Sequence, residues 1–247
     1  MAMTLEDWVT SAVIPFRDRP LPWLSQYHFF RDPSRPAYND ASYFFSPADG
    51  ILLYQETVGP GEAILDVKGT CYSARDVLRD GTFDQDSLVI AVFMTFFDVH
   101  VNRIPYPGRL SYRLAEPVDT LNYPMLAVEE ALLSDLRISL RSAFYLHNNQ
   151  RVINRIDSDQ LPGFYYVVQI ADYDVDSITP FELRQHQPCS QGERFSQIRY
   201  GSQVELLIPL STRYELGPLQ PVGAHVEAGV DPLVEVRRRT SATLKAR

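Results

Sequence analysis

The chain has 247 residues, of which 45% are hydrophobic and 22% are charged. This is the composition of a globular domain, and it excludes disordered, collagen-like and coiled-coil proteins. The formal net charge of -8 argues against a general nucleic-acid binder, because binding to phosphate backbones requires a clustered basic surface. Two cysteines, Cys71 and Cys189, are too few and too far apart for a disulfide framework or a cysteine-ligated zinc site.

The sequence shows no targeting or membrane-spanning segment. Residues 1–16 carry Glu6 and Asp7 and lack the basic head and apolar core of a secretory signal. The longest uncharged, mostly apolar stretch, Ser87–Phe97, is about half as long as the roughly 20 residues of a membrane span. With so few cysteines, a reducing compartment is the simplest assumption, and we expect a cytoplasmic protein.

Residues 1–45 form a predicted N-terminal arm that is rich in aromatic residues and prolines. Apolar residues recur at helical spacing over a short predicted helix, Leu5–Val13, with one face toward the core. A helix lying in a membrane interface is the alternative, but Glu6 and Asp7 have the wrong charge for anionic lipid. The prolines that follow predict an extended, packed segment.

Residues 46–247 are expected to form one β-dominated domain of the α+β class, with a sandwich or barrel core and few helices. Turn signals such as Asp49-Gly50 separate short runs of β-branched and aromatic residues. The predicted strands are Ile51–Val58, Ala63–Val67, Leu88–Phe97, Tyr165–Ile170 and Val204–Ile208.

The remaining segments have weaker signals. Apolar residues near helical period after Pro124 predict a helix over Met125–Leu140. Residues 171–200 are rich in Asp, Ser, Gln and Pro and are expected to be largely irregular. Residues 216–236 predict two short hairpins, and the basic residues from 237 onward predict a frayed, solvated tail that leaves lipid contact open.

Common catalytic motifs are absent from the sequence. There is no G-x-S-x-G elbow, no phosphate-binding G-x-x-x-x-G-K, no H-E-x-x-H and no dinucleotide-binding glycine triplet after a strand. Among the five histidines, only His100 falls in a recognisable pattern, so no metal site is expected. Surface or hydrogen-bonded core positions are expected for the other four, which are His28, His147, His186 and His225.

Three local features carry chemistry. At the end of the predicted strand over Leu88–Phe97, Asp98, His100 and Asn102 alternate and are expected to lie on one face, although an ordinary edge histidine is the alternative. Asp49 lies in a Pro-Ala-Asp-Gly turn, which by its chemistry alone is only a turn. The third feature is the only Gly-Ser pair in the chain, at residues 201 and 202, which alone is a weak signal.

Together these segments resemble the phosphatidylserine decarboxylase family, in its shorter bacterial and archaeal-type branch. The resemblance runs from about residue 29 to about residue 236, and the matching pieces follow the order of the family. They are Phe29–Arg35, Ser46–Gly50, Val67–Gly69 with Tyr72 and Ser73, Asp98–Arg103 with Pro105, Val168–Ala171 and Gly192–Ser202.

The resemblance implies a self-processing zymogen. A serine preceded by glycine attacks the preceding carbonyl, and the serine becomes a pyruvoyl group, so the scissile bond here is Gly201–Ser202 and the products are residues 1–201 and 202–247. Asp49 and His100 match the aspartate and histidine of the family and are the expected catalytic residues beside Ser202. The chemistry is consistent, since a serine hydroxyl needs a neighbouring base and glycine gives access to its carbonyl.

The same resemblance implies a decarboxylase whose pyruvoyl group binds the substrate amine and acts as the electron sink for decarboxylation. Pyridoxal phosphate, the usual alternative, is normally held by a lysine, and the chain has only Lys68 and Lys245. His100 is the candidate proton donor, and Asn102 with Arg103 is the candidate site for the substrate carboxylate or phosphate.

The expected reaction is phosphatidylserine to phosphatidylethanolamine and carbon dioxide, a step of phospholipid biosynthesis, with peripheral contact at the inner face of the membrane. Departures such as Thr95-Phe96, where the family has Ser-Pro, affect the pocket walls more than the three catalytic positions. Two alternatives therefore remain: a soluble decarboxylase for a free or carrier-bound amino acid, and an unprocessed, non-enzymatic binding homologue. The carrier-like hairpins expected over residues 217–236 contain no lysine for a biotinyl or lipoyl group. The sequence leaves the oligomeric state open.

Overall fold

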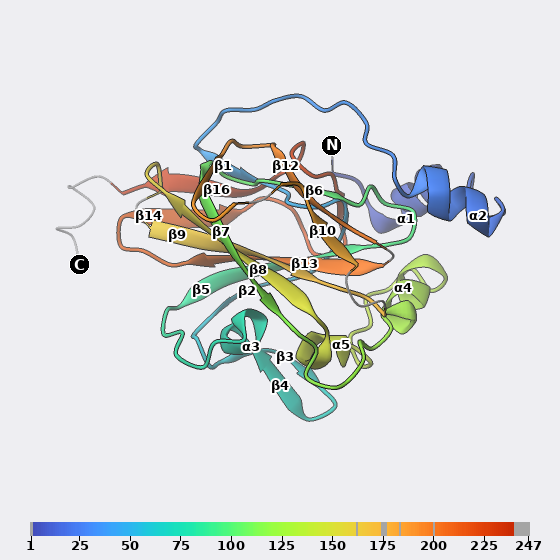
Figure 1. Cartoon of the computed structure of the whole chain (residues 1–247), viewed down its shortest axis with the longest axis horizontal. Helices are drawn as coiled ribbons and strands as arrows, with labels where there is room; N and C mark the ends of the chain where they lie inside the picture. The colour runs from blue at the N-terminus through green and yellow to red at the C-terminus, as the bar shows by residue number, and fades with distance from the viewer. Residues whose placement is uncertain (1, 162, 174–176, 183, 200, 240–247) are drawn as a thin grey trace.

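The computed structural model describes residues 2–161, 163–173, 177–182, 184–199 and 201–239. Short helices surround a set of antiparallel sheets, as Figure 1 shows. The expected α+β, β-dominated class with a sandwich core and few helices is confirmed. Among the described residues, no helix has the length and apolar character needed to cross a bilayer.

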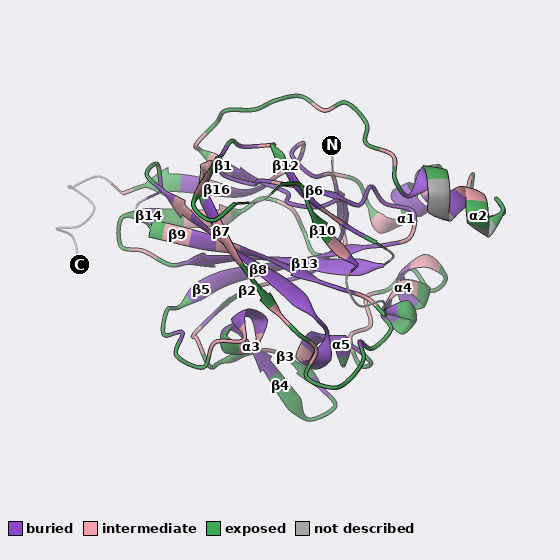
Figure 2. Cartoon of the chain, in the orientation of Figure 1, coloured by how far each residue is buried: buried purple, intermediate pink, exposed green. Residues whose placement is uncertain are grey.

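An eight-stranded sheet runs through the middle of the molecule, in the order β11-β7-β8-β9-β13-β5-β2-β15. Apolar side chains cover both of its faces, and β5 and β13 are buried along their whole length (Figure 2). β5 is a continuous apolar run from Leu88 to Met94, whereas β13 also contains the buried polar residues Ser202, Gln203 and Glu205. Its strands are β2 (Gly50–Val58), β5 (Ser87–Met94), β7 (Gly108–Ala115), β8 (Arg151–Ser158), β9 (Gly163–Ile170), β11 (Gln187–Cys189), β13 (Ser202–Pro209) and β15 (His225–Val226).

Smaller layers cover the two faces of this sheet (Figure 1). On one side lie two three-stranded sheets, β1-β16-β14 and β10-β12-β6, and on the other lies the hairpin β3-β4 with α3 and α5. The bounds are β1 (Tyr43–Phe45), β3 (Ala63–Val67), β4 (Thr70–Ser73), β6 (Val101–Arg103), β10 (Ile178–Pro180), β12 (Arg194–Ile198), β14 (Tyr214–Pro218), β16 (Pro232–Arg238), α3 (Ala74–Leu78) and α5 (Tyr145–Asn148).

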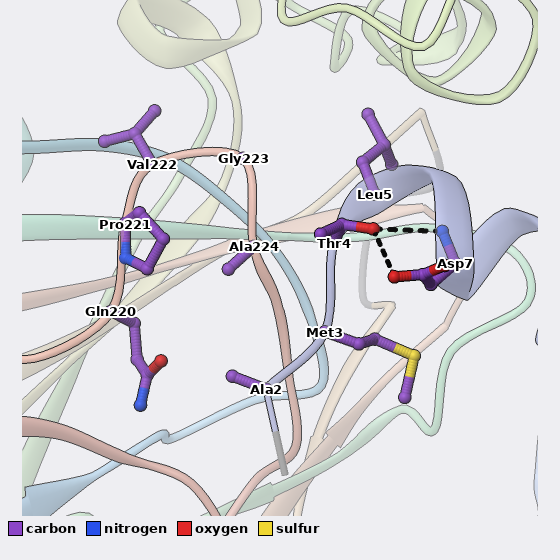
Figure 3. Close-up of a pocket in the computed structure, with 10 residues that line it drawn as sticks. All are labelled: Ala2, Met3, Thr4, Leu5, Asp7, Gln220, Pro221, Val222, Gly223 and Ala224. Carbon is purple, nitrogen blue, oxygen red and sulfur yellow. Dashed lines mark hydrogen bonds between the residues drawn. The ribbon is translucent and has the colours of Figure 1, made fainter.

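The N-terminal helix is confirmed, and its start has a clear cause. α1 (Leu5–Trp8) continues as a π-helical turn, η1 (Val9–Val13). The Thr4 hydroxyl accepts the Asp7 backbone N–H at 3.2 Å and donates to the Asp7 carboxylate at 2.7 Å, which caps the helix (Figure 3). A pocket of about 520 Å³ separates this turn from the loop over residues 220–224, which leads into β15.

The prediction that the rest of the arm is extended is wrong in part. A second short helix, α2 (Leu21–Trp23), continues as the π-helical turn η2 (Leu24–His28). Pro20 and Pro22 are compatible with it because they lie at its start, where backbone N–H groups have no acceptor within the helix.

Three other expectations are also corrected. The helix α4 covers only Leu126–Leu133, and the positive φ of 50° at Leu136 shows that the helix does not continue through this residue. Residues 171–200 contain three short strands that were not predicted, β10, β11 and β12, although most of the described residues of this segment are irregular as expected.

The third correction concerns the C-terminal segment, where two hairpins were expected. It contains one antiparallel pair, β14 with β16, while β15 pairs with β2. Arg237 and Arg238 belong to β16, so the expected frayed tail does not begin there. The rest of the predicted tail, residues 240–247, lies outside the described residues.

Candidate active site

Ser202 begins β13 and is completely buried. It pairs in register with Met94, the last residue of β5, and its hydroxyl donates to Met94 Sδ at 3.3 Å. A thioether sulfur is a weak acceptor, so this contact holds the hydroxyl only loosely. Ser202 is therefore a buried serine whose proton could be given to a stronger base.

Asp49 reaches the same end of β5 through a close backbone approach. Gly50 has a φ of 149°, and a Cβ atom on it would lie 2.0 Å from the Phe93 carbonyl oxygen, so only glycine fits. The Asp49 carboxylate accepts hydrogen bonds from both Nη atoms of Arg35, each at 2.6 Å, and from the Ala228 backbone N–H at 2.8 Å. These bonds tie the carboxylate to the N-terminal arm and to the loop before β16.

Arg35 and Asp49 form a buried ion pair, with side-chain exposures of 4% and 5%. Burial lowers the pKa of Arg35, but the hydrogen bonds and charge of Asp49 outweigh it, so that pKa is raised above its usual value. Asp49 therefore acts here as the counter-ion of Arg35. Its described hydrogen bonds do not include one to His100.

His100 also lies at the end of β5 and is fully buried. Its ring stacks on Phe29, with centroids 3.8 Å apart, and Nε2 lies 2.8 Å from the Thr95 carbonyl oxygen. Because a carbonyl only accepts, Nε2 carries the hydrogen and Nδ1 keeps its lone pair in the neutral ring. Nδ1 is buried and has no hydrogen-bond partner among the described residues.

Burial is the main reason that the pKa of His100 falls to about 4, and the charge of Arg31 adds to it, while the Thr95 and Ile198 backbones and the charge of Asp98 act in the opposite direction. The imidazole is therefore neutral at physiological pH. A neutral histidine with an open lone pair at a buried position is suited to accept a proton.

Asp98, His100 and Asn102 do not line one strand face, so that expectation is wrong. β5 ends at Met94, and the Asp98 carboxylate accepts the backbone N–H and hydroxyl of Thr95, both at 2.8 Å. These bonds turn the chain before β6, so the apolar Phe96-Phe97 pair lies in a turn.

Asp98 instead forms a buried pair with His225, a contact that was not predicted. His225 Nε2 lies 2.7 Å from Asp98 Oδ1, and its ring stacks on Trp8 with centroids 4.8 Å apart. Burial raises the pKa of Asp98, but His225 and Thr95 outweigh this effect and the net pKa is lowered. The pair is 127 residues apart in sequence, and no local spacing signals it.

Asn102 and Arg103 follow on β6. Asn102 is buried, and its side-chain oxygen accepts from Gln169 at 2.7 Å. Arg103 donates to Asp32 at 2.9 Å and to the Gly192 carbonyl at 3.0 Å. In this state the Arg103 guanidinium is engaged by the protein itself. The described residues contain no cluster of three or more His, Cys, Asp or Glu suited to a metal ion.

The three predicted residues, Ser202, His100 and Asp49, thus each lie beside the end of β5, next to Met94, next to Thr95 and, through the close approach of Gly50, next to Phe93, inside a β-dominated α+β domain. The family model described as Phosphatidylserine decarboxylase matches residues 26–231, a range that includes all three. The protein is by class a carboxy-lyase. It belongs to the phosphatidylserine decarboxylase family, which confirms the resemblance stated from the sequence.

Curated relatives agree with this assignment. The chain is 32% identical over 181 residues to the phosphatidylserine decarboxylase proenzyme of Pelagibacter ubique, covering 73% of this chain and 67% of the relative. It is 32% identical over 232 residues to the proenzyme of the same name from Beijerinckia indica, covering 90% and 81%. It is 31% identical over 210 residues to the putative archaetidylserine decarboxylase proenzyme of Methanopyrus kandleri, covering 85% and 81%.

Proposed function

We propose that this protein is a pyruvoyl-dependent decarboxylase that cleaves its own Gly201–Ser202 bond and then converts phosphatidylserine to phosphatidylethanolamine and carbon dioxide. The observation that carries the proposal is that a loosely held, buried Ser202 hydroxyl and the ring of His100, with its unpartnered Nδ1, contact the consecutive residues Met94 and Thr95 at the end of β5. The names of the relatives, decarboxylase proenzymes, support both the precursor state and the lipid substrate.

The processing chemistry follows from these groups. His100 Nδ1 takes the Ser202 proton, and Oγ attacks the Gly201 carbonyl carbon. The peptide C–N bond breaks, which leaves an ester and a free amine at residue 202. Removal of the Cα proton of residue 202 then expels the Gly201 carboxylate with the electron pair of the Cβ–O bond. The resulting dehydroalanine takes a proton at Cβ to become an imine, and water hydrolyses the imine to ammonia and a pyruvoyl group.

The residues present fit such a group. Position 202 supplies its atoms, and the only buried, unpartnered nitrogen of His100 lies at the same strand end. A pyruvoyl group supplies the electron sink that decarboxylation needs. His100 is the proposed donor of the proton that replaces carbon dioxide. Asp49 acts by holding the loop before Gly50 and the arm at Arg35 in place.

Asn102 and Arg103 are proposed to bind the substrate carboxylate or phosphate. A planar guanidinium suits both groups. Since Arg103 is held by Asp32 at 2.9 Å, the substrate must compete with that carboxylate. The Arg103 side chain is only 12% exposed and that of Asp32 is 25% exposed, so we expect the substrate to approach Arg103 past Asp32.

Membrane contact is proposed to occur through the end of the molecule that carries α1, α2 and α4 (Figure 1). Large apolar side chains are exposed there, including Ile14, Tyr27, Phe30 and Leu126 at 46%, 67%, 43% and 67%. Exposed apolar groups of this kind suit a lipid surface. These exposed apolar side chains support a lipid, rather than a free amino acid, as the substrate.

The function is tested with the purified wild-type protein. We expect the mass spectrum to show two fragments, residues 1–201 and residues 202–247 with a pyruvoyl group. Vesicles containing phosphatidylserine should release carbon dioxide and should sediment with the protein, whereas free serine should release none. A single intact chain of unmodified mass contradicts the proposal, and release from free serine alone would favour the soluble alternative.

A pH effect on stability follows from His100. Its pKa is about 6.5 in the unfolded chain and about 4 when folded, so the unfolded state binds more protons between these values. His100 alone therefore contributes a loss of stability of about 2 kcal/mol from pH 7 to pH 5, whereas Glu129, whose pKa is raised to about 7, acts in the opposite direction. In urea unfolding of the uncleaved Ser202→Ala protein, adding His100→Gln should remove the His100 loss and make the change in stability from pH 7 to pH 5 about 2 kcal/mol more favourable. The exposed His186→Gln change should leave the loss unaltered.

A further inference from the structure

Two carboxyl groups that the processing chemistry does not use lie beside the scissile bond. Glu129 belongs to α4, and its Oε1 accepts the Phe96 backbone N–H at 2.7 Å. Asp172 follows β9, and its Oδ1 accepts the Met125 backbone N–H at 2.8 Å. Their other oxygens face Gly201, because a Cβ atom on Gly201 would lie 3.2 Å from Asp172 Oδ2 and 3.4 Å from Glu129 Oε2.

The surroundings of Glu129 disfavour its ionised form before cleavage. Burial is the main cause that raises the pKa of Glu129 to about 7, and both charged neighbours that act on it, Asp172 and Asp98, push in the same direction. The Phe96 N–H bond opposes them only in part. Before cleavage the two carboxyl groups face a neutral peptide at Gly201.

Cleavage changes the charge at Gly201. The peptide carbonyl becomes a carboxylate, so a new anionic group appears next to Asp172 and the partly ionised Glu129. Carboxylates at contact distance repel one another strongly in a partly buried site. At the same time, residue 202 is fully buried in the uncleaved chain and a substrate amine cannot reach it without movement.

We propose that Glu129 and Asp172 repel the carboxylate that cleavage creates at Gly201, and that this repulsion moves the new C-terminus away and opens access to residue 202. The inference rests on the proposed function and assigns the two residues a positioning role that begins after cleavage. The new C-terminus is tethered to β12, which ends at Ile198, so its displacement leaves the central sheet intact.

The test compares cleaved wild-type protein with cleaved Glu129→Gln, Asp172→Asn and the double variant. The amide side chains keep an oxygen for the Phe96 and Met125 N–H groups but remove the charge. Access to residue 202 is measured by the rate at which phenylhydrazine labels its ketone, and movement is measured by hydrogen exchange of the peptide that ends at Gly201. We expect both rates to be at least tenfold lower in the double variant. Glu130→Gln, at the exposed neighbour of Glu129, should match the wild type.

A second comparison separates repulsion from a simple effect on folding. In the Ser202→Ala background no carboxylate forms at Gly201, so Glu129→Gln with Asp172→Asn should leave hydrogen exchange of the same segment unchanged.

Three outcomes overturn the inference: equal rates in all cleaved proteins, the same exchange difference in the Ser202→Ala background, or a double variant that remains one chain. If the double variant remains one chain, Glu129 and Asp172 are needed for the cleavage step itself and do not act only after it. A wild-type protein that stays uncleaved would remove the proposed function as well, whereas equal rates in cleaved proteins remove only this inference.

Discussion

Ser202→Ala is expected to leave the protein as one chain without decarboxylase activity. The substitution removes the hydroxyl oxygen that must attack the Gly201 carbonyl, and no other side-chain oxygen begins β13. Among the described residues, the lost hydroxyl bonds to Met94 Sδ alone, a weak acceptor, so folding should be almost unaffected. Intact mass and carbon dioxide release from phosphatidylserine vesicles measure both effects.

The matched control is Ser196→Ala on β12. Ser196 is also buried, and its hydroxyl donates to the Thr179 carbonyl at 3.2 Å. This variant should cleave and decarboxylate like the wild type. Two fragments from Ser202→Ala would show that the bond breaks by another route and would end the proposed mechanism.

Arg35→Met is expected to destabilise the uncleaved protein by about 3–5 kcal/mol, the usual cost of leaving one partner of a buried ion pair alone. Its partner, Asp49, would keep only the Ala228 N–H among the bonds described above. Urea unfolding in the Ser202→Ala background measures the loss, because that background keeps one reversible chain. Adding Asp49→Leu should recover much of it, since the isolated charge is then removed.

The exposed pair Arg137 and Asp135 provides the control. Their side chains are 64% and 51% exposed, and the 2.9 Å contact is screened by solvent. Arg137→Met should therefore change stability by about 0.5 kcal/mol or less. A loss below about 1 kcal/mol for Arg35→Met would mean that the buried pair is hydrated or replaceable, and Asp49 would lose its proposed role in fixing the arm.

Local patterns predicted several strands that are rich in β-branched, aromatic and other apolar residues. β2, β3, β9 and β13 lie within two residues of their predicted bounds because turn residues flank both ends. β5 was predicted too long because apolarity continues into Phe96-Phe97, while the bonds from Thr95 to Asp98 end the strand. α4 was predicted too long for a similar reason, since apolar spacing persists beyond the point where the backbone leaves the helix.

The motifs around Asp49, His100 and Ser202 also predicted the candidate site from the sequence, and the catalytic roles of these residues stay predictions. The sequence did not predict their hydrogen-bond partners. Arg35 lies within a matching segment, but only the fold shows that it binds Asp49. The Asp98–His225 pair and the two carboxyl groups at Gly201 join segments far apart in the chain, and such contacts depend on tertiary packing that has no local period.

The position of β13 between β5 and β9 has a consequence for the mature enzyme. Under the proposed cleavage, the smaller piece keeps an interior strand of the central sheet, and its β16 stays paired with β1. The two polypeptides would then remain associated without a covalent link. They would have folded as a single precursor, and a dissociated pair would have no continuous chain to guide reassembly. The working life of the catalyst would therefore depend on how slowly the sheet first opens rather than on an equilibrium.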